Sequence, residues 1–193
     1  MSIRTTQDDA RENAQIELLK LTPLQGRSNK YIPDGTIMVD GTPELVELKT
    51  SDVEKKQVST ARNVTLPKIE EWQKVWWVFS QYKKTSQGFE FTGNHYAAHG
   101  TELDEWFELQ RKKILQGTKT YGGLDHWEKA KAILSEHNMP QETIERLNNS
   151  FHKKGCGLND PKIGWRTIEK LCVKLNEANP HDHFADIIRA KRK

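Results

Sequence analysis

Two short hydrophobic runs flank a pair of turn residues in the first quarter of the chain. Residues 37–39 (Ile-Met-Val) precede Asp40-Gly41, and residues 45–46 (Leu-Val) follow them. Because aspartate and glycine tolerate positive φ, this arrangement predicts a β-hairpin with a two-residue turn. Pro43 is unfavourable so close to a tight turn, which leaves a four-residue loop open as the alternative. Both loops have an even length, so both predict the same two faces.

The predicted register separates the hairpin into an apolar face and a charged face. Counting back from the turn puts Asp34 directly opposite Glu47, with Cβ atoms roughly 4.5–5.5 Å apart. Lys49 follows Glu47 by two positions, so strand alternation sends its side chain to the same face. The other face is a core face formed by Ile37, Val39, Val46 and Leu48. We therefore expect the charged trio, which is Asp34, Glu47 and Lys49, to look outward.

Hydrophobic spacing elsewhere in the first hundred residues predicts strands joined by helices. Residues 7–21 repeat apolar side chains at helical spacing. The predicted apolar stripe of this helix is Ala10, Ala14, Leu18 and Leu21. Residues 75–82 are rich in β-branched and aromatic side chains and predict a buried strand. A short helix capped by Thr65, and short strands near residues 89–91 and 96–98, complete a mainly β region.

Helical spacing takes over in the second half of the chain. The predicted helices cover residues 103–116, 124–137 and 141–151, one that starts at residues 159–161, and one from residue 181 onward. A length of 193 residues suits a single domain over residues 1–193 with a real core. Trp76, Trp77, Trp106 and Trp127 are expected in that core. We therefore predict an α/β fold with a helical second half.

Composition and charge narrow the class of protein. The 30 basic residues nearly cancel the 27 acidic ones, and a formal net charge of +3 does not by itself indicate a nucleic-acid partner. Cys156 and Cys172 lack metal-binding spacing, so neither a disulfide framework nor a zinc site is implied. No apolar run approaches the roughly 20 residues of a membrane helix. We expect a soluble cytoplasmic protein with no membrane partner.

The charged face of the hairpin has the residue types of a phosphodiester hydrolase. Two carboxylates on adjacent strands, Asp34 and Glu47, suit Mg²⁺, a hard cation. Water and substrate phosphates complete its coordination shell. Such an ion activates water and stabilises charge that develops on phosphorus. Lys49 could orient the attacking water, take part in proton transfer or neutralise the scissile phosphate. The alternative is a surface Glu-Lys pair without chemistry.

The sequence Pro33-Asp34, followed by Glu47-Leu48-Lys49, resembles the motif of the PD-(D/E)xK nucleases. Over residues 26–82 the chain is most similar to PvuII-like type II restriction endonucleases. This resemblance implies a mixed central β-sheet flanked by helices, with a catalytic core at about residues 26–100 and a DNA-contacting helical region at about 101–193. It also implies Mg²⁺ bound by Asp34 and Glu47, with Lys49 as the catalytic lysine.

The same resemblance suggests where DNA is contacted. The candidate DNA-binding residues are Ser59, Thr60, Arg62, Asn63, Tyr82, Asn159, Asp160 and Lys162. Arg62 has the geometry to read guanine, and Asn63 or Asn159 to read adenine. The alternatives are turn and cap chemistry for the asparagines, a solvated surface lysine for Lys162, and a buried strand tyrosine for Tyr82.

Two departures from the PvuII-like pattern indicate a different recognition sequence. Residues 61–63 (Ala-Arg-Asn) replace a histidine-rich run, and residues 103–154 form a longer segment. We expect a type II restriction endonuclease that binds double-stranded DNA and cuts both strands as a homodimer, because one site cuts one strand and a two-fold dimer matches a palindrome.

Other functions remain open at this point. A junction resolvase, or a nicking or heterodimeric subunit, would use the same motif, and a non-catalytic DNA-binding protein would keep the same scaffold. His181-Asp182-His183 could suggest a metal site, but helix capping is the favoured interpretation because no third ligand lies nearby in the sequence.

Overall fold

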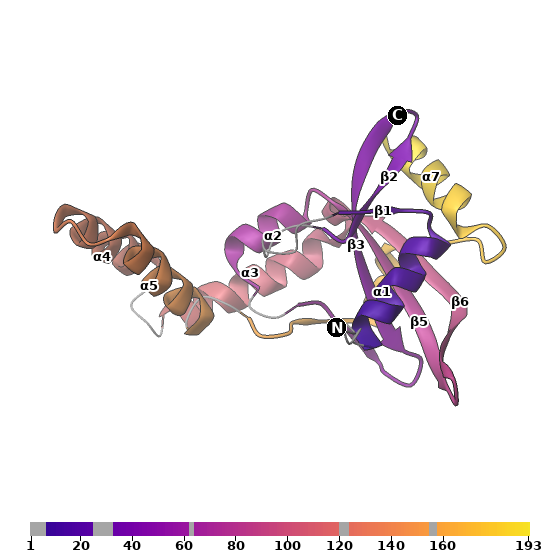
Figure 1. Cartoon of the computed structure of the whole chain (residues 1–193), viewed down its shortest axis with the longest axis horizontal. Helices are drawn as coiled ribbons and strands as arrows, with labels where there is room; N and C mark the ends of the chain where they lie inside the picture. Colours follow the sequence, from indigo (N-terminus) through magenta and orange to yellow (C-terminus); the bar gives the residue numbers. More distant parts are fainter. Residues whose placement is uncertain (1–6, 25–32, 62–63, 120–123, 155–157) are drawn as a thin grey trace, which may run out of the picture. The chain divides into compact units, whose positions relative to one another are not determined.

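The computed structural model describes residues 7–24, 33–61, 64–119, 124–154 and 158–193. Within them the chain is an α/β protein with a mixed central sheet (Figure 1). It divides into two compact units. The first comprises Met1–Thr60, Glu71–Leu103 and Lys162–Lys193, and the second comprises Ala61–Glu70 and Asp104–Pro161. No helix in the described residues combines the length and apolar character needed to span a membrane.

A six-stranded sheet forms the framework of the first unit. Its strands, in spatial order, are β1 (Thr22–Pro23), β2 (Gly35–Val39), β3 (Thr42–Asp52), β5 (Trp76–Thr85), β6 (Gly88–His99) and β8 (Val173–Lys174). β3 and β5 are parallel, and every other pair is antiparallel. The buried strand predicted at residues 75–82 is confirmed as β5. The two short strands predicted after it form one long strand, β6, whose register shifts opposite Gln81.

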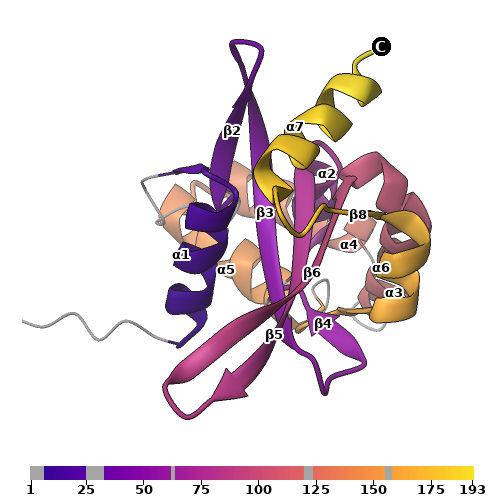
Figure 2. The same cartoon turned by 90° about the vertical axis from the view of Figure 1, so that its right-hand side faces the viewer.

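Two helices cover one face of this sheet, α1 (Gln7–Leu18) and α7 (Pro180–Lys191) (Figure 2). The predicted core face of the hairpin points toward them, and its residues, Ile37, Val39, Val46 and Leu48, are 4% exposed or less. These side chains join one hydrophobic cluster with residues of both helical segments, including Leu19 and Phe184. Strand alternation therefore sends Glu47 and Lys49 to the opposite face of the sheet.

The buried face of α1 differs from the predicted stripe. Ala10 is exposed and Leu18 is half-buried, whereas Gln15 and Leu19 are completely buried. The prediction was wrong because apolar periodicity overlooks a glutamine whose amide is buried with hydrogen bonds to the sheet. The helix also ends at Leu18 rather than at residue 21, and Lys20 follows with a left-handed φ of 51°.

A second, two-stranded sheet pairs β4 (Gln57–Ser59) with β7 (Lys162–Gly164). The helix predicted to start at residues 159–161 was wrong, because β7 comes first and α6 (Trp165–Leu171) follows it. Strand pairing with a segment about a hundred residues away overrides the local helix signal. The helix predicted after Thr65 is confirmed as α2 (Leu66–Trp72). The Thr65 hydroxyl, however, is buried without a hydrogen-bond partner in the described residues, so the predicted cap is absent.

The second unit is mainly helical. After the short helix η1 (Gly100–Leu103) of the first unit come α3 (Asp104–Lys119), α4 (Leu124–Glu136) and α5 (Gln141–Lys154), as the hydrophobic spacing predicts. α4 and α5 run side by side (Figure 1), and the Trp127 indole N–H donates to Asn148 Oδ1 at 2.7 Å. The four tryptophans expected in the core are all buried, with exposed fractions between 0% and 8%.

Candidate active site

The β2–β3 hairpin turns through Asp40 and Gly41, as predicted. Their φ angles of 50° and 77° are those of a two-residue turn with both central residues left-handed. Val39 pairs with Thr42, and the register continues to Gly35 opposite Val46. Pro43 is accommodated because it lies beyond the part of β3 that pairs with β5, which begins at Val46. The four-residue loop is therefore excluded.

The register brings the charged trio together at the open end of the hairpin. Lys49 Nζ lies 2.6 Å from Glu47 Oε1 and 3.8 Å from Asp34 Oδ2. Asp34 precedes β2 by one residue, and its N–H donates to the Val46 carbonyl at 3.0 Å. The Leu48 N–H donates to Asp34 Oδ2 at 2.7 Å, which fixes this carboxylate against β3. The predicted shared face of Asp34, Glu47 and Lys49 is confirmed.

The trio does not look outward, contrary to the sequence prediction. Glu47 is 6% exposed, and the side chains of Lys49 and Asp34 are 13% and 21% exposed. Lys49 Nζ lies 5.9 Å from the centre of the Trp77 ring, which is itself fully buried. The prediction was wrong because it treated the hairpin as an isolated surface element. In the whole sheet, the neighbouring strand β5 places the Trp77 ring next to Lys49, so the charged face is partly covered.

Electrostatics keep Lys49 positively charged despite its burial. Burial alone would lower the pKa of Lys49, but the carboxylates of Glu47 and Asp34 outweigh it, and the pKa is raised above the ordinary 10.5. Glu12 of α1 adds to the same effect. The sequence prediction missed Glu12, because no spacing rule connects a helix residue with a hairpin that lies far along the chain.

The donor set of the trio fits a hard divalent cation. The Lys49 ammonium contacts three oxygens, from Glu47, Asp34 and the Leu48 carbonyl, the last at 2.8 Å. These oxygens already surround a positive charge, and carboxylate and carbonyl oxygens are the protein ligands that Mg²⁺ accepts. Asp34 and Glu47 would hold the ion, with waters and a substrate phosphate as further ligands. The described residues contain no cluster of three or more His, Cys, Asp or Glu side chains suited to a metal.

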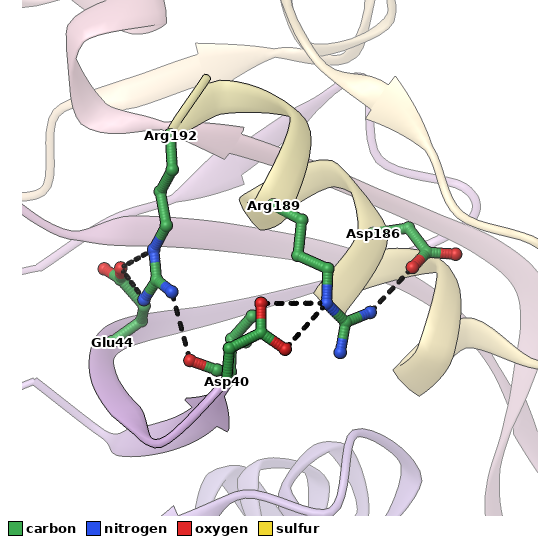
Figure 3. Close-up of polar contacts among 6 residues, drawn as sticks. Asp40, Glu44, Asp186, Arg189 and Arg192 are labelled. Carbon is green, nitrogen blue, oxygen red and sulfur yellow. Dashed lines mark hydrogen bonds and ion pairs between the residues drawn. The ribbon is translucent and has the colours of Figure 1, made fainter.

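Asp40 and Glu44 of the hairpin belong to a separate cluster at the turn (Figure 3). Arg189 Nε donates to both carboxylate oxygens of Asp40, at 3.0 and 3.2 Å. Arg192 donates to Glu44 and, at 3.0 Å, to the Val39 carbonyl. We call Asp40, Glu44, Arg189 and Arg192 the tip cluster. The basic end of α7 therefore binds the hairpin.

Two of the predicted DNA-contacting segments lie next to each other. In the first unit, Ser59 of β4 pairs with Lys162 of β7, and both are exposed. In the second unit, the Asp160 N–H donates to the Ala61 carbonyl at 3.1 Å. In each unit, therefore, two residues about a hundred positions apart in the sequence are neighbours: Ser59 and Lys162 in the first, and Ala61 and Asp160 in the second.

The remaining predicted DNA contacts are placed differently. Asn159 is exposed, whereas Thr60 is 7% exposed and lies below the surface. Tyr82 is buried on the side of α1, where the Arg11 guanidinium lies 4.6 Å from its ring centre. The structure does not bring Tyr82 to the trio. Arg62 and Asn63 lie outside the described residues.

The His181-Asp182-His183 sequence serves the start of α7. Asn179 is the N-cap and accepts from the Asp182 N–H, and His183 Nδ1 accepts from the Asn176 N–H at 2.9 Å. Hydrogen bonds from His181 and Asn179 lower the pKa of Asp182. The three residues thus lie in the first turn of α7, where they take part in its hydrogen bonds, but the capping residue is Asn179 rather than one of the three. Scans of the chain against models of protein families and against curated proteins returned no match, so the function has to be argued from the geometry of the site.

Proposed function

We propose that this chain is a Mg²⁺-dependent nuclease of the PD-(D/E)xK type that hydrolyses phosphodiester bonds of DNA. The observation that carries the proposal is that the carboxylates of Asp34 and Glu47 both lie within 4 Å of the Lys49 ammonium at one end of the hairpin. The mixed sheet supports it as well, because the strand with Glu47 and Lys49 pairs in parallel with a buried neighbour, as in a restriction-endonuclease-like core.

Each residue of the trio has a separate role in the proposed reaction. Asp34 and Glu47 bind Mg²⁺, which when bound polarises the phosphate and lowers the pKa of a water ligand. Lys49 carries a full positive charge, so it stabilises the negative charge that develops on phosphorus and orients the attacking water as a hydrogen-bond donor. The attacking water forms the new P–O bond and loses a proton to the solvent, the old ester P–O bond breaks, and the departing oxygen takes a proton from another water.

Within this family we propose a type II restriction endonuclease that acts as a homodimer. The exposed Ser59 and Lys162 of the first unit would contact DNA, and so would the exposed Asn159 of the second unit. Because one trio cuts one strand, two copies related by a two-fold axis are needed to cut both strands of a palindrome.

Incubation with plasmid and phage DNA in the presence of Mg²⁺, followed by sequencing of the ends, tests this proposal. Discrete fragments that share one end sequence are the expected result. Nicked circles without linear product would contradict the restriction-enzyme proposal and favour a nicking subunit. Intact DNA in both Mg²⁺ and Mn²⁺, across linear and branched substrates, would exclude every nuclease of this type.

A further inference from the structure

A buried line of hydrogen bonds runs from α1 across the sheet. The Gln15 Nε2 amide donates to Ser80 Oγ at 2.7 Å, and His95 Nδ1 lies 2.8 Å from the same hydroxyl. Gln15 and Ser80 are fully buried, and His95 is 3% exposed. Three polar side chains therefore connect α1, β5 and β6 inside the hydrophobic face of the sheet.

The hydroxyl in the middle sets the direction of these hydrogen bonds. Because Ser80 Oγ accepts from Gln15, its own proton is available to His95 Nδ1, which acts as an acceptor in the neutral ring. Burial lowers the pKa of His95, and the two charged groups near it, Glu177 and Lys174, act in opposite directions. The network is thus built for a neutral histidine.

The same amide also reaches the backbone behind the active-site lysine. Gln15 Nε2 lies 3.5 Å from the Lys49 carbonyl and 3.5 Å from the Val78 carbonyl, on the two parallel strands. Glu12 stands one turn before Gln15 on α1 and is one of the charges that stabilise the Lys49 ammonium. Gln15 therefore connects the helix that carries Glu12 with the strand that carries Lys49.

Stability alone is a poor explanation for this glutamine. Its Oε1 atom is buried with no hydrogen-bond partner among the described residues. An unpaired buried oxygen offsets much of the stability that the Nε2 contacts contribute, and an unbranched apolar side chain would fill the same volume without that cost. The amide at position 15 is better explained by the position in which it holds α1 against the strands that carry Lys49 and Ser80.

We propose that Gln15, oriented by Ser80 and His95, is a positioning residue of the nuclease site that anchors α1 to the backbone of Lys49 and thereby fixes the distance over which the charge of Glu12 acts on the lysine. This inference rests on the proposed nuclease function. It assigns a role to three residues that do not touch the substrate, and it makes cleavage depend on a hydrogen-bond network on the opposite side of the sheet.

The test compares Gln15→Met with the double variant Gln15→Met/Ser80→Ala, and with Asn13→Ala as a control at an exposed position of α1. Methionine keeps the length of the side chain but removes the amide that donates a hydrogen bond to Ser80 Oγ. The double variant also removes the hydroxyl that lost its donor, but it leaves the buried His95 Nδ1 without Ser80, so its stability should recover only in part. We expect both Gln15 variants to cleave about tenfold more slowly in single turnover, since small misplacements of reacting groups are costly. DNA binding in Ca²⁺ should stay within about twofold of the wild type.

Several outcomes would overturn the role of Gln15. Normal cleavage by Gln15→Met would do so, and so would a double variant that regains cleavage together with stability, because the effect would then be structural only. If the wild-type protein cuts no DNA, the nuclease proposal has failed. Amide hydrogen exchange at residues 49–51 then tests whether Gln15 anchors α1 to the backbone of Lys49. Faster exchange in Gln15→Met than in Asn13→Ala would support the anchor, and equal exchange would exclude it.

Discussion

The two ends of the β2–β3 hairpin carry similar charges in opposite surroundings. At the open end, Glu47 and Lys49 form a pair at 2.6 Å, with side chains 8% and 13% exposed. In the tip cluster, Arg189 and Asp40 form a pair at 3.0 Å, with side chains 45% and 59% exposed. The second pair of the tip cluster, Arg192 and Glu44, has side chains 32% and 25% exposed. Both pairs of the tip cluster are therefore more exposed to water than the pair of Glu47 and Lys49.

The difference determines what each cluster can do. Water and salt screen the tip cluster, so its pairs contribute little to the free energy of folding and leave few means of shifting reactivity. In the covered trio, charges interact more strongly, and an unmatched charge is expensive. Two carboxylates held near one ammonium keep an excess of negative charge, which a divalent cation would neutralise. Burial therefore separates the trio, with its excess of negative charge, from the screened ion pairs of the tip cluster.

Removal of the ammonium from the trio should have the largest effect. Lys49→Ala is expected to slow DNA cleavage on the order of 10²–10³-fold, because a preorganised positive charge at the phosphate is lost. Specific binding to DNA in Ca²⁺ should remain. Lys55→Ala, which changes an exposed lysine just beyond β3, is the matched control. Cleavage at the normal rate by Lys49→Ala would refute the catalytic assignment.

Two glutamates of the same strand allow a direct comparison of stability. Glu47→Gln should lower the free energy of unfolding by about 3 kcal/mol, because the Lys49 ammonium stays buried without its closest partner. Glu44→Gln in the tip cluster should lower it by less than about 1 kcal/mol. Urea unfolding in the absence of divalent cations measures both. Equal losses would show that burial does not separate the two clusters.

Alkaline pH should weaken the trio and spare the tip. The pKa of Lys49 is raised above 10.5 in the folded protein, so its contribution to stability is complete below 10.5 and is lost as the pH rises through the folded pKa. Arg189 stays charged, because hydrogen bonds to Asp40 and Asp186 raise its already high pKa. A rise from about pH 8 to about pH 11.5 should therefore lower the free energy of unfolding more in the wild type than in Lys49→Met. Urea unfolding at both pH values measures this difference.

The comparison with Lys49→Met removes the contributions of two other groups to the pH dependence. Burial raises the pKa of Tyr96, and it raises the pKa of Cys172 to about 12, so both also favour unfolding at alkaline pH. They are present in both proteins. The same pH dependence in both would indicate that Lys49 is not held by its carboxylates.

Loss of the tip cluster should have the smallest effect. The double variant Arg189→Gln/Arg192→Gln is expected to lower the Tm by about 2 °C at low salt, and by less in about 1 M salt, where the Debye length is about 3 Å. Cleavage should stay within about twofold of the wild type. Lys193→Gln removes a charge from the same end of the chain and is the control. A large drop in cleavage would mean that the tip helps to shape the site.

Local signals account for the part of the site that was predicted. The Asp40-Gly41 turn determines the register over a few residues, and alternation then places Glu47 and Lys49 on one face without knowledge of the rest. The hydrophobic strand β5 was equally clear, because its predicted residues 75–82 are β-branched or aromatic except for Ser80 and Gln81. Both features depend on neighbours in sequence, which a single chain displays directly.

Features that depend on distant partners were missed. β7 is a strand because β4 is available to pair with it, and residues 159–164 taken alone suggest a helix start. Gln15 is buried because Ser80 accepts its hydrogen bond, and Glu12 acts on Lys49 only because α1 packs beside β3. The covering of the trio was missed for the same reason, since Trp77 comes from another strand. The nuclease function itself stays a prediction.

The bonds between α7 and the hairpin also give the molecule an order of assembly. The β2–β3 turn closes between residues that are neighbours in the chain, and hairpins of this kind form in about 1–10 µs. The contact between Arg189 and Asp40 spans 149 positions and must wait until most of the chain is in place. We expect the hairpin to be present in the folding transition state and the α7 contacts to form after it. The two ends of one hairpin would then be completed at different stages of folding.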